Sequence, residues 1–196
     1  MTMVTADRVM GTVWLVWIVS WLAAAAWSDR AAKRPTVARE IVYRVVTIAG
    51  VVLLFGFYDP GGTLSAPRWR PPAAVGWACV GMSVAGLAFT WWARIFLGRL
   101  WSSSVTRKSN HRVIDTGPYG IVRHPIYTGV IAAVLATAAI RGTAAAWLGA
   151  VIVITGLYIK ARLEEAFLRQ ELEAAAYDAY ARRVPMLIPF VRVFAR

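Results

Sequence analysis

Five apolar runs, separated by shorter polar stretches, occupy most of the chain. They cover residues 10–27, 41–57, 73–97, 126–140 and 144–159. Because roughly 20 apolar residues cross a bilayer as a helix, the pattern predicts an all-α integral membrane protein with about five transmembrane helices. Only a short turn at Arg141 and Gly142 separates the last two runs, so they are expected to form a helical hairpin. Residues 1–97 then contribute three spans, and residues 98–196 form a second, catalytic region.

The carboxy-terminal tail has a different pattern. Residues 160–183, "KARLEEAFLRQELEAAAYDAYARR", are charged and carry apolar residues at three- and four-residue spacing. This pattern predicts that the fifth span continues beyond the membrane as an amphipathic helix, which forms part of the cofactor site. Pro185 and Pro189 end that helix, and the segment "VPMLIPF" around them is expected to lie back on the membrane or on the site.

The charge distribution orients the predicted spans. The chain has a formal net charge of +12, and its basic residues cluster between the apolar runs. With five alternating spans, 16 Lys and Arg residues fall on the side of the tail and 4 on the other. Cytoplasmic loops carry the excess of basic residues, so the amino terminus is expected outside and the tail in the cytoplasm. Basic residues in these positions flank membranes, and no nucleic-acid partner is expected.

Several other classes find little support in the sequence. An alternative for the first run is a cleaved signal peptide ending near Ala23–Ala26, but Arg8 is neutralised by Asp7 and the apolar core is long. The composition, 59% hydrophobic and 16% charged, is more apolar than that of soluble domains. The chain has two histidines and one cysteine, without metal-ligand spacing, and no nucleotide-binding glycine motif, so no metal site is expected.

Two polar groups of residues interrupt this apolar pattern. The first is the stretch 117–130, "GPYGIVRHPIYTGV", in which His124 and Pro125 mark the start of the fourth span, since proline is tolerated in the first helical turn. Arg123 and two tyrosines flank them, which is either an ordinary membrane flank or a binding site. The second is Lys160, Arg162, Glu164 and Glu165, at the end of the fifth run. Lys160 and Glu164 share a helix face, and a surface salt bridge is the simpler alternative.

These segments carry a family resemblance. "HRVIDTGPYGIVRHPIYTG", followed by the tail segment, resembles the isoprenylcysteine carboxyl methyltransferase family and the related membrane phospholipid methyltransferases, over about residues 100–190. The resemblance implies S-adenosylmethionine bound at the cytoplasmic edge of the membrane and a lipophilic or lipidated acceptor that enters from the bilayer. The cofactor contacts that it implies are His111, Arg112, Val113, Ile114, Tyr119, His124, Pro125, Ile126, Tyr127 and Glu164.

The start of the fourth span suits such a cofactor. The amino-acid carboxylate of the cofactor is expected to find positive charge and free N–H groups at this helix start. Arg123 is expected to point toward a carboxylate or a lipid phosphate. Tyr119 and Tyr127 are expected to shape the pocket, because an unperturbed phenol titrates near ~10.

The acceptor is the least determined part of the prediction. The prenylcysteine enzymes have an arginine four residues before the glutamate, where this chain has Lys160, which keeps the charge but loses the bidentate fork. A carboxylate acceptor would be oriented by Lys160 or Arg162 and would need no general base. An amine or hydroxyl acceptor would need one, for which Glu164 or Glu165 is the candidate.

The sequence therefore predicts a multi-pass methyltransferase of a bacterial inner membrane, with membrane lipids and a lipophilic carboxylate as partners. Phospholipid or amine N-methylation and small-thiol S-methylation remain alternatives. So do an NADPH-dependent enzyme of the sterol-reductase type and a non-enzymatic protein that binds anionic lipid.

Overall fold

The structure is a computed structural model that describes residues 5–24, 37–56, 64, 66–98, 114–171 and 174–191. Within these ranges the chain forms helices and no strands, apart from an isolated bridge between Pro67 and Thr143. The seven helices of the described ranges are α1 (Ala6–Ala23), α2 (Val37–Phe55), α3 (Ala73–Leu97), α4 (Pro118–Ile121), α5 (Pro125–Arg141), α6 (Ala144–Glu171) and α7 (Ala174–Arg183). The prediction of an all-α fold is confirmed.

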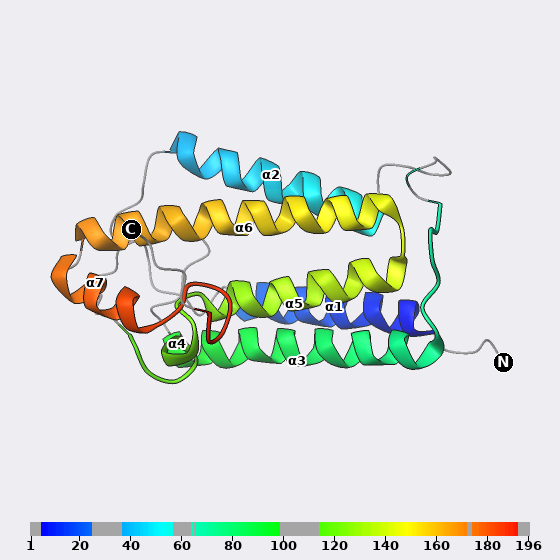
Figure 1. Cartoon of the computed structure of the whole chain (residues 1–196), viewed down its shortest axis with the longest axis horizontal. Helices are drawn as coiled ribbons and strands as arrows, with labels where there is room; N and C mark the ends of the chain where they lie inside the picture. Colours follow the sequence, from blue (N-terminus) through cyan, green and yellow to red (C-terminus); the bar gives the residue numbers. More distant parts are fainter. Residues whose placement is uncertain are drawn as a thin grey trace.

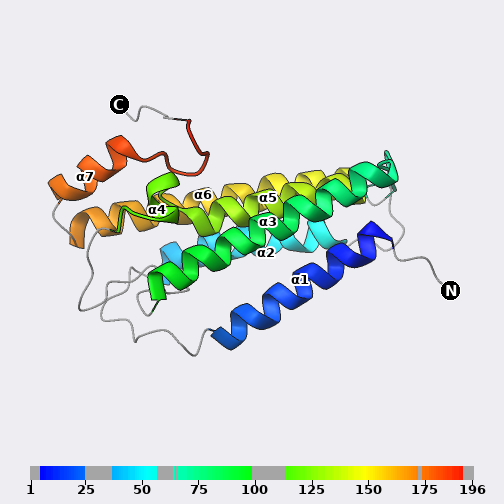
Figure 2. The ribbon, with the colours of Figure 1, turned by 90° about the horizontal axis from the view of Figure 1, so that it is seen from below.

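The five long helices lie side by side along the molecule, and the short helices α4 and α7 gather at one end (Figure 1). Helix α2 packs along α6, and α3 packs along α5. A view from below shows α1 alongside α3 on the outside of the bundle (Figure 2). The bundle thus brings the start of α5 and the end of α6 to the same end of the molecule as α7.

Glycines allow two of these helix pairs to pack backbone to backbone. A Cβ atom at Gly86 of α3 would lie 2.6 Å from the carbonyl oxygen of Gly129 in α5. In the other pair, a Cβ atom at Gly149 of α6 would lie 2.6 Å from the carbonyl oxygen of Gly50 in α2. Small residues at such contacts are a common means of helix association in membranes, where the hydrophobic effect does not drive helices together.

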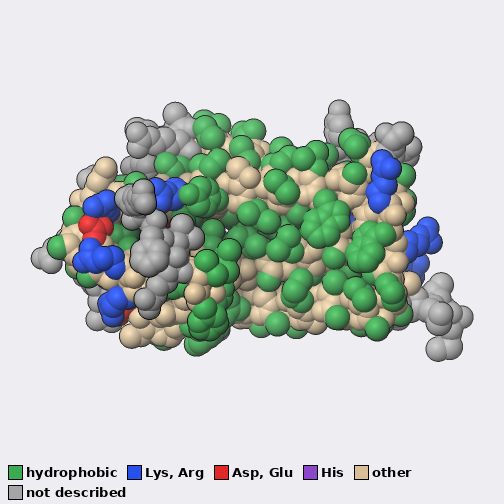
Figure 3. Space-filling model, viewed as in Figure 1, with side chains coloured by type: hydrophobic (Ala, Val, Ile, Leu, Met, Phe, Trp, Pro, Cys, Tyr) green, Lys and Arg blue, Asp and Glu red, His purple; other side chains and the backbone are tan. Residues whose placement is uncertain are grey.

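Membrane character is clearest in three of the helices. Helices α1, α3 and α6 are long and apolar enough to cross a membrane, and α5 is a shorter apolar helix. Helix α2 has 19 residues but carries Glu40 and Arg44 in its first half. Large apolar side chains are exposed along the bundle, and hydrophobic side chains cover its middle between charged ends (Figure 3). The chain is a membrane protein, while the number of five spans stays a prediction.

The predicted helical hairpin is confirmed, because α5 and α6 are joined through Gly142, which has a φ of 60°. The tail differs from the prediction in one respect. Helix α6 continues without interruption from the apolar run to Glu171, but a separate helix, α7, begins at Ala174. The tail therefore contains two helices and can fold back toward the start of α5.

Candidate functional site

The site is organised around the junction between α4 and α5. Gly117, with a φ of 57°, precedes the single turn of α4, and Val122 is extended. His124 then occupies the N-cap of α5 and Pro125 its first turn, as the sequence predicts. The proline ring fixes φ at a helical value, and its missing N–H costs nothing in the first turn, where an N–H has no partner within the helix. The chain therefore turns into α5 at this point, with the His124 imidazole at the helix start.

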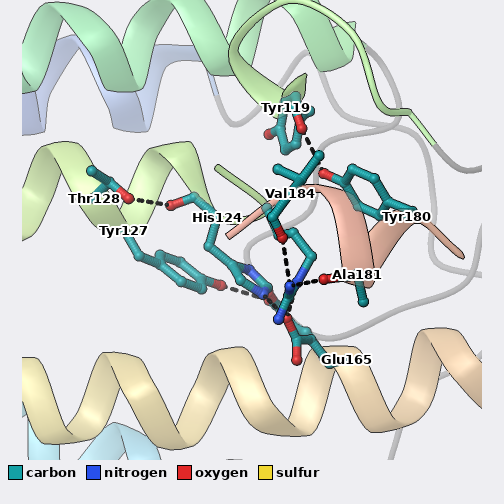
Figure 4. A network of polar contacts seen from close by, with 10 residues as sticks. Tyr119, His124, Tyr127, Thr128, Glu165, Tyr180, Ala181 and Val184 are labelled. Atoms are coloured by element: carbon teal, nitrogen blue, oxygen red, sulfur yellow. Dashed lines mark hydrogen bonds and ion pairs between the residues drawn. The ribbon is translucent and has the colours of Figure 1, made fainter. Parts of the chain in front are cut away.

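His124 lies between two carboxylates of α6. Its Nδ1 is 3.5 Å from Glu164 Oε2, and its Nε2 is 3.2 Å from Glu165 Oε1. The Tyr127 ring stacks on the imidazole at 5.3 Å between centroids, and its hydroxyl donates to Glu164 Oε1 at 2.6 Å (Figure 4). We call His124, Tyr127, Glu164 and Glu165 the carboxylate cluster. All four side chains are buried or half-buried, so water screens their charges poorly.

Arg123 connects this cluster to α7. Its Nε donates to Glu165 Oε1 at 2.7 Å, and one terminal nitrogen donates to the carbonyl oxygens of Ala181 at 2.9 Å and Val184 at 2.6 Å. A guanidinium at the carboxyl end of α7 satisfies carbonyls that have no partner within the helix and opposes the helix dipole. Arg123 was expected to point toward a ligand carboxylate or a lipid phosphate; in the structure it pairs with Glu165, a carboxylate of the chain itself.

The segment after α7 lies on the site. The backbone N–H of Arg123 donates to the carbonyl of Pro185 at 2.8 Å, and that of His124 donates to the carbonyl of Met186 at 3.1 Å. The Thr128 hydroxyl donates to the carbonyl of Leu187 at 2.6 Å. The segment was predicted to lie on the membrane or on the site, and in the structure it contacts the site.

The same contacts bear on the expected position of the cofactor. Positive charge and free N–H groups at this helix start were expected to receive the cofactor's amino-acid carboxylate, and that expectation stays a prediction. The N–H groups of Arg123 and His124 and the Arg123 guanidinium bond to carbonyls of residues 181–186 and to Glu165. The reason is the return of the tail, which places carbonyl oxygens where an incoming anion was expected.

Protonation in this region follows from burial and from the carboxylates. Burial lowers the pKa of the His124 imidazole, but hydrogen bonds to Glu164 and Glu165 and their charges outweigh it, so the pKa is raised overall. Burial raises the pKa of the Tyr119 and Tyr180 hydroxyls above the ordinary value; the Glu164 charge adds to the effect at Tyr119, and the Arg123 charge opposes it at Tyr180. The Tyr180 hydroxyl donates to the Tyr119 carbonyl at 2.8 Å, so these phenols are structural groups that keep their protons.

Lys160 lies beside the cluster, on the face of α6 that carries Glu164. Its Nζ is 5.3 Å from the centroid of the Tyr127 ring and 5.6 Å from that of Tyr43 in α2. An ammonium against aromatic faces is stabilised by the ring quadrupoles. Arg162 is exposed, and a separation of two residues places it on a different face of the helix from Glu164. The structure therefore brings Lys160, but not Arg162, to the cluster.

The other predicted contacts have different surroundings. Ile114 and Tyr119 are half-buried before α5, Pro125 is fully buried, and Ile126 packs against the hydrophobic core. His111, Arg112 and Val113 lie outside the described residues.

The sequence interpretation missed Tyr43 as a neighbour of this site. Tyr43 and Arg44 in the second apolar run, with Glu40 directly before it, were a sequence signal, because polar groups are costly inside a membrane helix. In the described part of the chain, no group of three or more His, Cys, Asp and Glu side chains is arranged to hold a metal ion.

About half of the chain matches the model of a known protein family. Residues 79–170 match the isoprenylcysteine carboxyl methyltransferase (ICMT) family. This confirms the resemblance inferred from the sequence motifs, and it indicates a membrane methyltransferase. The matched segment contains His124, Tyr127, Lys160, Glu164 and Glu165, and it ends before α7.

A curated relative was also found. The cobalt-zinc-cadmium resistance protein CzcN of Cupriavidus metallidurans is 27% identical over 152 residues, which is 76% of this chain. The aligned region covers 62% of the relative's own length. The name of that protein describes a metal-resistance function and not a methyltransferase.

Proposed function

We propose that the chain is an S-adenosylmethionine-dependent methyltransferase that transfers a methyl group to a lipophilic carboxylate. The observation that carries this proposal is the carboxylate cluster, which is buried at the charged end of an apolar helix bundle and lies in the segment matching the ICMT family. A site at the edge of the apolar belt can receive a polar cofactor from water and a lipophilic acceptor from the bilayer.

The residues present fit a cationic methyl donor. Glu164 and Glu165 supply two carboxylates, and the Tyr127 ring supplies an aromatic face, both of which attract a cation. Glu164 would hold the cofactor, with Tyr119, His124, Pro125, Ile126 and Tyr127 around it. When bound there, S-adenosylmethionine supplies an activated methyl group.

The chain's own residues then act by positioning. Tyr127 and His124 fix the orientation of the Glu164 carboxylate, Tyr127 through a hydrogen bond of 2.6 Å and His124 through an ion-pair contact of 3.5 Å. The Lys160 ammonium, one helical turn away, would orient an acceptor carboxylate by charge. A carboxylate is already a nucleophile, so no proton has to be removed and no general base is required. Exclusion of water by the buried cluster protects the activated methyl group.

The membrane arrangement proposed with this function follows the charge distribution. Helices α1, α2, α3, α5 and α6 would span a bacterial inner membrane, with the amino terminus outside and the cluster at the cytoplasmic face. In support, the described basic side chains of α7 and of the end of α6 lie at the same end of the bundle as the cluster (Figure 3).

The experiment is a methyl-transfer assay with detergent-purified protein, radiolabelled S-adenosylmethionine and N-acetyl-S-farnesylcysteine as the acceptor probe. A methyl ester releases volatile methanol in base, which distinguishes O-methylation from N- or S-methylation. The wild-type chain should form the base-labile product. Lys160→Gln should lose at least about 90% of kcat/KM. The control Arg169→Gln should keep the wild-type kcat/KM, because the Arg169 side chain is exposed and pairs with Asp178.

Two results would contradict this proposal. A folded wild-type chain that binds NADPH and not S-adenosylhomocysteine would support the reductase alternative. A base-stable product, formed only with amine or thiol probes, would reject the carboxylate acceptor.

A further inference from the structure

The segment after α7 has two parts with different surroundings. Met186 and Leu187 are half-buried and pack against the hydrophobic core. The apolar side chains that follow are exposed, by 62% at Ile188, 94% at Phe190 and 48% at Val191. Figure 2 shows this segment, in red, on the outside of the bundle. We call residues 188–191 the apolar turn.

The backbone of the apolar turn makes this exposure unusual. The Val191 N–H donates to the Ile188 carbonyl at 3.3 Å, which closes a turn with Pro189 and Phe190 at its centre. Phe190 has a φ of 65° and is the one residue other than glycine with a positive φ in the described ranges. Turns of this kind favour glycine at that position, because a bulky side chain is strained there. A nearly fully exposed ring gains little within the chain in return, so a partner outside the chain is the better explanation.

The depth of the apolar turn follows from its connection to α5. The Thr128 hydroxyl donates to the carbonyl of Leu187, the residue just before the turn, at 2.6 Å. Thr128 is three residues after Pro125, which places it about 4.5 Å along the helix at a rise of 1.5 Å per residue. Because α5 is an apolar helix of the bundle, the segment reaches from the polar end of the molecule to the edge of its apolar belt. In a membrane this edge is the bilayer interface.

Positive charge lies at the base of the same segment. The last turn of α7 carries Arg182 and Arg183, which are both exposed. Arg183 pairs with Asp115 at 2.9 Å, with side chains that are still open to water. Exposed apolar patches mark protein or membrane contacts. Apolar side chains at the edge of the belt, next to basic ones, fit the interface of an anionic bilayer, which takes the former among its acyl chains and the latter at its phosphates.

We propose that the apolar turn is a membrane anchor, which inserts its side chains into the interface of an anionic phospholipid bilayer. The guanidinium groups at the end of α7 bind the lipid phosphates. Because Pro185 and Met186 accept hydrogen bonds from the N–H groups of Arg123 and His124, insertion of the turn also holds the tail on the junction before α5. The bilayer thereby stabilises the carboxylate cluster, whichever reaction the site performs.

The first test measures the depth of the turn in a bilayer. The full chain with Cys79→Ala, which removes its one cysteine, receives a fluorescent label at Val191→Cys or at Ala175→Cys, an exposed control position in α7. Nanodiscs of equimolar phosphatidylcholine and phosphatidylglycerol hold the protein. The label at position 191 should lie about 5–10 Å inside the interface. Lipids with a nitroxide near the top of the acyl chain should therefore quench it, and aqueous iodide should not. The label at position 175 should behave in the opposite way.

Two results of this test would overturn the proposal. Equal quenching by iodide at the two positions would mean that the turn stays in water. Shielding of the Val191→Cys label from both iodide and the lipid nitroxide would mean that protein covers the turn.

A second test uses the strained residue itself. Glycine suits the positive φ better, so Phe190→Gly should hold the tail more firmly if only the turn matters, and less firmly if the ring is the anchor. The amides of Arg123 and His124 report on this through hydrogen–deuterium exchange. In the same nanodiscs the proposal predicts about tenfold faster exchange in Phe190→Gly and a change within about twofold in Phe190→Leu, which keeps an apolar side chain. Unchanged or slower exchange in Phe190→Gly would overturn the proposal.

The lipid charge is tested with the same label. Replacing phosphatidylglycerol by phosphatidylcholine should raise the iodide quenching of the Val191→Cys label about twofold or more. Arg182→Gln should reduce this difference. The control Arg8→Gln should not, because Arg8 is exposed at the amino-terminal end of α1. Equal quenching in the two lipid compositions would overturn the assignment of an anionic surface as the partner.

Discussion

Replacing Glu165 with glutamine removes a negative charge on which two positively charged or protonatable groups converge. Glu165 Oε1 accepts from Arg123 Nε at 2.7 Å and lies 3.2 Å from His124 Nε2. The Glu165 and Arg123 side chains are each 12% exposed, so neither charge is well solvated. Glutamine has nearly the same shape and keeps an acceptor oxygen, so the substitution isolates the contribution of the charge.

The expected loss of stability follows from these two contacts. A hydrogen bond to a charged group contributes about 1.5–3 kcal/mol, and a neutral one about 0.5–1.5 kcal/mol. The difference is about 1 kcal/mol for each contact, which gives about 2 kcal/mol for the pair. Arg123 keeps its bonds to the carbonyls of Ala181 and Val184, so the guanidinium does not lose all its partners. For a domain of this size, about 2 kcal/mol corresponds to a decrease of about 4–8 °C in Tm.

The assay is thermal unfolding of the detergent-purified chain. The matched control is Asp178→Asn, another acid-to-amide change, in an ion pair with Arg169 whose side chains are 60% and 30% exposed. Exposed pairs contribute about 0–1 kcal/mol, so the control should shift Tm by at most about 4 °C. Equal shifts for Glu165→Gln and Asp178→Asn would refute the assignment of Glu165 as the charge that joins α5, α6 and α7.

Two further predictions concern helix packing and pH. Gly86→Ala should destabilise the chain by about 1–3 kcal/mol, because the added Cβ would meet the Gly129 carbonyl oxygen at 2.6 Å. The control Gly81→Ala should leave the stability unchanged, because its Cβ would meet nothing within 4 Å. Similar Tm values for the two variants would contradict the close packing of α3 and α5. The raised pKa of His124 means that the folded chain holds this proton more tightly than the unfolded chain. Its stabilising effect is complete below the ordinary value of 6.5 and is lost as the pH rises through the raised pKa. Tm should therefore fall above about pH 6.5, and His124→Gln should reduce this slope; an unchanged slope would exclude His124 as its source.

The helices were predictable because a helix satisfies its backbone hydrogen bonds within one segment, so the apolar pattern of that segment is enough to locate it. The third run was predicted at residues 73–97, where α3 lies, and the fourth began at Pro125 because proline fits only the first turn. The break between α6 and α7 was not predictable, because the tail keeps a helix-favouring composition across it.

The candidate site was partly predictable for the same local reasons. Helical spacing placed Lys160 and Glu164 on one face, and the proline placed His124 at a helix start. The position of Tyr43 depends on α2 packing along α6, which no local pattern encodes. Likewise, only the return of the tail shows that the carbonyls of Pro185 and Met186 occupy the N–H groups at the junction.

Calorimetric titration of the detergent-purified chain with S-adenosylhomocysteine tests the central claim most directly, with Glu164→Gln and Asp178→Asn measured beside it. The account predicts micromolar binding to the wild type and to Asp178→Asn, and binding at least about tenfold weaker to Glu164→Gln, since that carboxylate would contact the cofactor. If the folded wild-type chain does not bind, or if Glu164→Gln binds as tightly as the wild type, the carboxylate cluster is not a cofactor site.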